Sequence, residues 1–161
     1  MSRMRRLADG RGFTFVELVV VTTILLVLAS TAIPMSQVVT QRRKEAELRQ
    51  ALREMRTAID RFKDAVDQGL IATSEVEAGH EGYPPDLDVL VEGVSVVGDA
   101  TERELLFLRR VPVDPTTGEA EWGLRSYLDE PDARSWGGDS VFDVRSLSEG
   151  TALDGTRYRD W

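Results

Sequence analysis

The longest hydrophobic pattern in the chain runs from Phe13 to Ile33 and contains 21 residues, of which only Glu17 carries a formal charge. In an α-helix, a segment of this length would be roughly 31 Å long, which is close to the thickness of the hydrocarbon core of a bilayer. The sequence therefore predicts a membrane-spanning helix over residues 13–34.

Glu17 is the residue of this segment that needs a partner. A carboxylate at bilayer depth costs a few kcal/mol, and the segment contains no cationic side chain to offset that cost. Cleavage between Gly12 and Phe13 would create a new α-amine four residues before Glu17, about one helical turn away on the same face. This amine, or that of a neighbouring subunit, could neutralise the carboxylate.

A second hydrophobic pattern follows, with apolar residues at steps of three and four positions and no Gly or Pro between Ser36 and Asp67. The apolar residues are Leu48, Ala51, Leu52, Met55, Ala58, Ile59, Phe62, Ala65 and Val66. This spacing predicts an amphipathic second half of the long helix over residues 35–69, with Gly69 as its stop. We expect the apolar face to pack on the protein's own sheet; a coiled coil with a partner is the alternative.

Pro34 and the charged residues add detail to this long helix. Pro34 lacks an amide donor, so we expect it to kink or locally break the helix near the membrane boundary. Glu45 and Arg49 are spaced for a favourable ion pair on the helix surface. The other faces of the helix are expected to carry Arg49, Arg53, Glu54, Arg56, Asp60, Lys63 and Asp64.

Residues 70–161 are expected to form a globular domain with short elements. A helix is predicted over Asp86–Val91, and a second one from the capping-box pair Thr101 and Glu104 to a point before Pro112. Strand patterns occur at Trp122, Leu124 and Leu128 and again over Val141–Leu147, and the aromatic residues Tyr158 and Trp161 are expected to hold the tail on the domain. The fold class is α+β: a long N-terminal helix packed on a small antiparallel sheet.

The charge distribution bounds the partners. The chain has 20 basic and 28 acidic residues and a net charge of −8. Residues 1–12 hold four arginines and one aspartate, which leaves 16 basic and 27 acidic residues, or −11, in the remainder. No nucleic-acid partner is expected for so acidic a surface. By the positive-inside rule, the four arginines of residues 1–12 predict that the N-terminus lies in the cytoplasm and the C-terminal domain across the membrane.

The residues needed for common catalytic sites are scarce. There is one histidine and no cysteine, and no phosphate-binding loop, nucleophile elbow or zinc-protease motif occurs. Disulfides cannot stabilise the domain. We therefore expect a protein that is not an enzyme.

The N-terminal residues resemble those of a known family. Gly12, Phe13, Thr14 and Glu17, followed by the apolar run and Pro34, are similar to the signal sequence of type IV pilins and of type II secretion pseudopilins. The resemblance implies that prepilin peptidase removes leader residues 1–12 by cutting after Gly12, and that Phe13 is N-methylated. It also implies that the helix over 13–34, with Glu17 and Pro34, serves filament assembly.

Two further stretches resemble the major, G-type pseudopilins. Residues 108–118 have the order L-R-R-x-P-x-D-P-x-T-G, which is similar to the turn before the sheet in that group. Residues 146–161 resemble the group's calcium loop, with Asp154, Glu149 and Asp143 as the candidate Ca²⁺ ligands. The alternative is that Asp154 and Gly155 form a simple turn and that these acids are solvated. The lack of cysteine also favours a pseudopilin, because many type IV pilins carry a C-terminal disulfide.

The resemblance implies a pilin-like lollipop that works as a structural subunit of a pseudopilus driving protein export. Its partners would be further copies of itself in a helical homopolymer, prepilin peptidase, an inner-membrane secretion or pilus assembly platform, minor pseudopilins and membrane lipid. It would lie in the bacterial inner membrane as a single-pass protein, with its C-terminal domain, residues 70–161, in the periplasm.

Two alternatives stay open. The first is a major or minor subunit of a type IV pilus, used for adhesion, motility or DNA uptake. The second is an unprocessed single-span protein with a ligand-binding exported domain, or an ordinary secretory signal in place of the cleaved leader.

Overall fold

The computed structural model describes residues 13–71, 81–98 and 104–161, without the side chains of residues 31–36. Within it the chain forms two compact units, Met1–Val39 and Thr40–Trp161. The predicted leader and Gly12 lie outside the described residues, as does Thr101 of the expected capping box.

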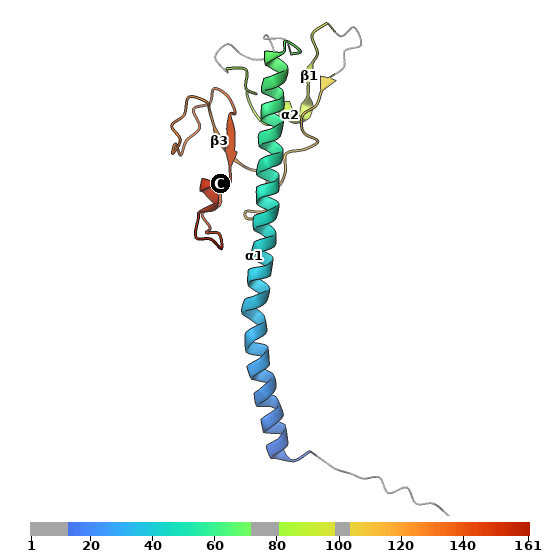
Figure 1. Cartoon of the computed structure of the whole chain (residues 1–161), viewed down its shortest axis with the longest axis vertical. Coiled ribbons are helices and arrows are strands. Elements are labelled where there is room, and N and C mark those ends of the chain that lie inside the picture. The colour runs from blue at the N-terminus through green and yellow to red at the C-terminus, as the bar shows by residue number, and fades with distance from the viewer. Residues whose placement is uncertain (1–12, 72–80, 99–103) are drawn as a thin grey trace, which may run out of the picture. The chain divides into compact units, whose positions relative to one another are not determined.

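Helix α1, Phe15–Asp67, contains 53 residues and begins in the first unit (Figure 1). In the first unit, the apolar side chains that the structure describes are exposed. The helix continues through Pro34, so the expected local break is not found. A proline within a helix removes only one backbone hydrogen bond, and the turns on both sides can hold the helical path.

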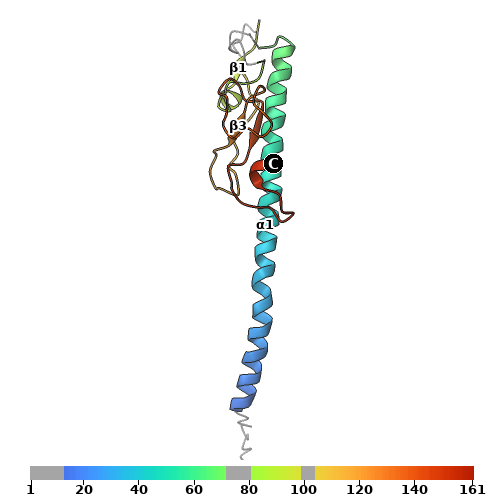
Figure 2. The same cartoon turned by 90° about the vertical axis from the view of Figure 1, so that its left-hand side faces the viewer.

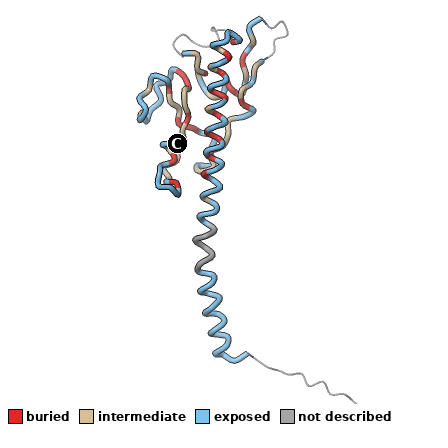
Figure 3. The backbone as a smooth tube through the Cα atoms, in the orientation of Figure 1, coloured by how far each residue is buried: buried red, intermediate tan, exposed pale blue. Residues whose placement is uncertain are grey.

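In the second unit, one face of α1 forms the core of the domain (Figure 3). Leu48, Met55, Ile59 and Phe62 are fully buried there, together with their apolar neighbours on the same face. This confirms the amphipathic pattern read from the sequence. The apolar face packs on the chain's own strands and loops rather than lying free for a coiled-coil partner.

The end of α1 follows from Gly69, as predicted. Gly69 has a φ of +68°, and its amide donates to Val66 O over 2.9 Å. The next amide, that of Leu70, donates to Ala65 O over 2.9 Å. This pair of bonds satisfies the last carbonyl groups of the helix, and glycine adopts the left-handed conformation that it requires without a Cβ penalty.

The predicted α+β class is confirmed, because a long helix packs on small antiparallel sheets, which the described residues form as two ribbons rather than one sheet. The first pairs β1, Val94–Ser95, with β2, Glu104–Leu105. The second pairs β3, Gly123–Arg125, with β4, Asp143–Arg145, in the register Gly123 to Arg145, Leu124 to Val144 and Arg125 to Asp143. β3 and the residues around it lie beside the second-unit part of α1 (Figure 2).

The predicted helix near Asp86–Val91 is confirmed as the short helix α2, Val89–Glu92, which buries Leu90. The prediction of a helix between Thr101 and Pro112 is wrong, because Glu104 and Leu105 form strand β2. The backbone amides of Phe107 and Leu108 both donate to Leu90 O, at 3.1 and 2.8 Å. These hydrogen bonds to α2 satisfy the backbone amides of Phe107 and Leu108 while the segment is extended. They depend on tertiary structure, which the local capping pattern does not reveal.

The C-terminal strands are shorter than the sequence pattern indicated. Leu128 is 70% exposed and lies beyond β3, so the predicted alternation stops at Leu124. Trp122 is buried before β3, where its indole Nε1 donates to Pro112 O over 2.9 Å. The chain ends in the 3-10 turn η1, Tyr158–Asp160, and the predicted anchoring of the tail is confirmed because Tyr158 belongs to the core.

Candidate functional site

The first turn of α1 is built around Thr14 and Glu17. Thr14 lies just before the helix, and its Oγ1 accepts a hydrogen bond from the backbone amide of Glu17 over 3.2 Å. This is the N-cap half of a capping box, and it fixes the start of the helix at Phe15. Phe13 therefore precedes the helix, and its side chain is exposed. Glu17 is an acid in the first turn, where the helix dipole favours negative charge.

Three hydroxyl groups in the described part of this apolar segment donate to its own carbonyl groups. Thr22 Oγ1 donates to Leu18 O over 2.9 Å, Thr23 Oγ1 to Val19 O over 2.7 Å, and Ser30 Oγ to Val27 O over 2.7 Å. Such bonds to earlier carbonyl groups let hydroxyls lie in an apolar medium at little cost. Among the residues that the structure describes, the Glu17 carboxylate has no hydrogen-bond or ion-pair partner.

The membrane-spanning helix predicted over residues 13–34 stays a prediction. In the described part of the chain, no helix meets the length and hydropathy needed to cross a bilayer.

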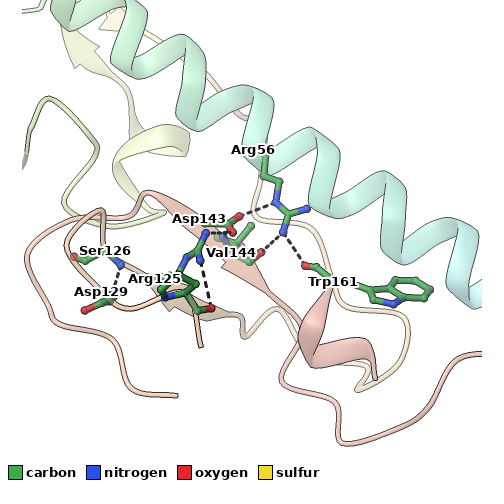
Figure 4. A network of polar contacts seen from close by, with 8 residues as sticks. Arg56, Arg125, Ser126, Asp129, Asp143, Val144 and Trp161 are labelled. Carbon is green, nitrogen blue, oxygen red and sulfur yellow. Dashed lines mark hydrogen bonds and ion pairs between the residues drawn. The ribbon is translucent and has the colours of Figure 1, made fainter. Parts of the chain in front are cut away.

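A chain of charges in the second unit joins α1 to the second ribbon (Figure 4). Arg56 Nε of α1 donates to Asp143 Oδ1 of β4 over 2.7 Å. Asp143 Oδ2 accepts from Arg125 Nη2 of β3 over 2.9 Å, across the strand pair. Arg56 Nη2 also donates to the backbone oxygens of Val144, at 3.0 Å, and Trp161, at 2.7 Å. One guanidinium group thus binds the helix, a strand and the tail together.

The tail makes a second set of contacts with α1, about three and four helical turns before Arg56. Glu45 is buried, and its Oε1 accepts from the Leu153 amide at 2.8 Å and from Tyr158 Oη at 3.2 Å. Gln41 Nε2 donates to Thr151 O at 3.0 Å and to Tyr158 Oη at 3.1 Å. Burial raises the pKa of the Tyr158 phenol above its ordinary value.

Arg49 completes this edge of the helix. Its guanidinium lies 4.1 Å from the centre of the Trp161 ring, a cation–π arrangement. It also lies 3.6 Å from Asp154 Oδ2. The Thr156 hydroxyl and amide both donate to Asp154, and these bonds, together with Arg49, hold the pKa of this carboxyl below its ordinary value.

Sequence reasoning missed the role of these arginines. It placed Arg49 and Arg56 on solvated faces and paired Arg49 with Glu45, whereas the described ion pairs link Arg49 to Asp154, and Glu45 binds the tail. The signal was available in part: Arg49, Arg56 and Lys63 recur every seven residues and so lie along one edge of the helix. The carboxylates that pair with Arg49 and Arg56 lie about a hundred residues away in the chain and could not be identified from spacing.

Each of the three predicted calcium ligands binds a different set of partners. Asp143 pairs with Arg56 and Arg125, Glu149 with Arg159, and Asp154 with Thr156 and Arg49. Within the described ranges, no group of three or more acidic or histidine side chains is placed to hold a metal ion. Ca²⁺ needs six to eight oxygen ligands. The residues present do not fit a Ca²⁺ site in this arrangement.

The motif over residues 108–118 forms the expected turn, and its centre is buried. Asp114 is fully buried, where it accepts hydrogen bonds from the Thr116 amide, at 2.7 Å, and from the hydroxyls of Thr116 and Ser146. Gly118, with a φ of +84°, closes the turn by donating to Asp114 O over 2.8 Å. The turn is thereby attached to the residue that follows β4.

Comparison with known proteins bears on the N-terminal segment. A family model described as the prokaryotic N-terminal methylation motif matches residues 9–33. The matched range contains Gly12, Phe13 and Glu17, the residues of the expected cleavage, methylation and assembly sites. No curated protein and no solved structure matches the chain. The match over residues 9–33 supports a type IV pilin-like, prepilin-type protein, of the kind that prepilin peptidase processes.

Proposed function

We propose that this protein is a pseudopilin, a non-enzymatic subunit of the filament that drives protein export through a type II secretion system. The observation that carries the proposal is the Glu17 carboxylate, which has no partner among the described residues and lies in the first turn of an exposed apolar helix. It lies inside the N-terminal methylation motif. An apolar helix that exposes its side chains must bury them against lipid or against other helices.

The chemistry of assembly follows from Glu17. The hydroxyls of Thr22, Thr23 and Ser30 are satisfied within the segment, whereas the Glu17 carboxylate has no partner among the described residues. Removal of the leader after Gly12 would give each subunit a positive amine at Phe13. A neighbouring subunit could present that amine to Glu17, and the ion pair would be strong because the surrounding helices exclude water.

The choice of a secretion filament over a pilus rests on the sequence. The chain has no cysteine for a pilin-type disulfide, and the turn over residues 108–118 resembles that of the major, G-type pseudopilins. The acidic remainder of the chain gives no support to a role in DNA uptake. Neighbouring copies, the inner-membrane assembly platform and minor pseudopilins are the partners in this proposal. Anchoring in the inner membrane by residues 13–34 belongs to it as well.

A gene-disruption experiment tests this function. The gene is deleted, and the strain is complemented with the wild-type chain, with Glu17→Ala, or with Glu54→Ala as a matched control, since Glu54 is also an exposed glutamate of α1. We expect protein export into the medium to be lost in the deletion and in the Glu17→Ala strain, and kept in the control, with surface pili unchanged. Loss of pili, motility or DNA uptake with normal export would instead favour the type IV pilus subunit.

A further inference from the structure

Each carboxylate that the sequence offers for calcium faces a guanidinium group. Asp143 lies between Arg56 and Arg125, at 2.7 and 2.9 Å. Glu149 lies 3.2 Å from Arg159, and Asp154 lies 3.6 Å from Arg49. The same pairing thus recurs at all three positions.

Asp143 shows most clearly what the arginines do. Its two oxygens are taken separately, Oδ1 by Arg56 Nε and by the Val144 amide, and Oδ2 by Arg125 Nη2. The bonds of Asp143 to Arg56 and to Arg125 are both part-buried. Solvent therefore screens these charges less than it screens a surface ion pair. A Ca²⁺ ion at this carboxylate would have to displace a guanidinium and would lie beside two positive groups.

Arg56 also makes the contacts that a bridging cation would make. Its Nη2 binds the backbone oxygens of Val144 and Trp161, so it joins strand β4 and the tail to α1. A planar guanidinium holds several donors in fixed directions and can bind carboxylate and carbonyl oxygens at once. Arg49 adds a second attachment through the Trp161 ring.

We propose that arginines of α1, with Arg56 at the centre, take the place of a bound metal ion in this protein and hold β4 and the tail on the helix without calcium. Strand β4 and the tail are then attached to α1 by side chains of the protein itself, so the attachment does not depend on the calcium concentration around the domain. This proposal concerns the stability of the second unit and is independent of the filament's role in secretion.

The test compares calcium and chelator on the processed full chain purified in detergent. Thermal unfolding is recorded with millimolar calcium and with a chelator, for the wild type, Arg56→Ala and Arg56→Lys. Arg53→Ala is the matched control, because Arg53 is exposed on the same helix and makes no ion pair within the described residues. Hydrogen exchange of the amides in residues 143–161 reports on the attachment directly.

We expect the melting temperature of the wild type to be the same in calcium and chelator. Arg56→Ala should lower it by about 5 °C, the size of shift that losing one such interaction produces in a domain of this length. Exchange over 143–161 should become faster in this variant and stay unchanged in Arg53→Ala. Arg56→Lys keeps the positive charge but loses the several fixed donors of the guanidinium group. Its melting temperature should therefore lie between those of the wild type and Arg56→Ala.

Two results would overturn the proposal. One is a rise in the melting temperature of the wild type when calcium is added. This measurement uses the wild type alone and so does not depend on whether a variant folds. The other is Arg56→Lys and Arg56→Ala matching Arg53→Ala in melting temperature and exchange.

Discussion

Arg56 on helix α1 and Asp143 on strand β4 are 87 positions apart in the chain, and their side chains meet at 2.7 Å. The pair fixes where the second ribbon sits on the helix, and through Trp161 O it also fixes the tail. A contact between segments so far apart in the chain has to overcome the entropy of closing the loop between them. The second unit is thus defined by a few polar attachments over an apolar core, whereas the first is a helix that exposes its apolar side chains.

Replacing buried Asp114 should destabilise the second unit. Asp114→Ala removes the acceptor for the Thr116 amide and for the Ser146 hydroxyl, and a buried donor left unpaired costs about 1–3 kcal/mol. Asp114→Asn keeps one acceptor oxygen and should cost less. Chemical denaturation of the two variants measures this, with Asp139→Ala as the control because Asp139 is exposed. Equal stability of Asp114→Ala and the wild type would show that the turn does not support the fold.

Alkaline pH should weaken the attachment of the tail. Burial raises the pKa of Tyr158 above its ordinary value of 10.0, so the folded state holds this proton more tightly than the unfolded chain. The resulting stability is complete below pH 10.0 and is lost as the pH rises through the higher folded-state pKa. Ionised Tyr158 would also lie against the buried Glu45.

Tyr158→Phe separates this effect from general alkaline unfolding. At neutral pH the variant should be about 1 kcal/mol less stable, because the bonds to Gln41 and Glu45 are lost. Above pH 10 its melting temperature should fall less steeply than that of the wild type. Tyr127→Phe, at an exposed position, is the control. Parallel curves for Tyr158→Phe and the wild type would exclude Tyr158 as the titrating group.

Glu17→Ala should separate membrane insertion from assembly. Removing a carboxylate from an apolar segment lowers the cost of insertion, so the variant should enter the membrane fraction at least as well as the wild type. Assembly should fall by about tenfold or more, because a desolvated charge pair is lost. Quantifying subunits in sheared filaments against those in the membrane measures both. Wild-type filament yield from Glu17→Ala would refute the docking role.

Gly12→Glu should block processing of the leader. A peptidase must approach the backbone at the cut closely, and glycine leaves room that a glutamate side chain would occupy. Intact mass of the membrane form should therefore show the full chain. Cleavage at the wild-type site and rate in this variant would contradict the assignment of the cut.

The sequence was sufficient where structure depends on near neighbours. The spacing of Leu48, Met55, Ile59 and Phe62 predicted the buried face of α1, and Gly69 predicted its end. Both depend on periodicity and backbone conformation, which act over a few residues. The candidate assembly residues stay a prediction, which rests on the offset of four residues between Phe13 and Glu17 and on the resemblance of this segment to pilin signal sequences.

The sequence was insufficient where contacts between segments distant in the chain determine the local structure or the partners of a side chain. The capping pattern at Glu104 was overridden by pairing between Leu105 and Val94, and the segment became a strand. The roles of Arg49 and Arg56 depended on which residues the folded tail and β4 bring to them. Charged residues on a helix face look alike in the sequence whether they face solvent or a distant carboxylate.

The most direct test of the central claim is the N-terminal sequence and intact mass of the protein isolated from membranes. We expect a chain that begins at Phe13, with a methyl group on its α-amine, so that a positive terminus is present near Glu17. A membrane form that still begins at Met1 would contradict it.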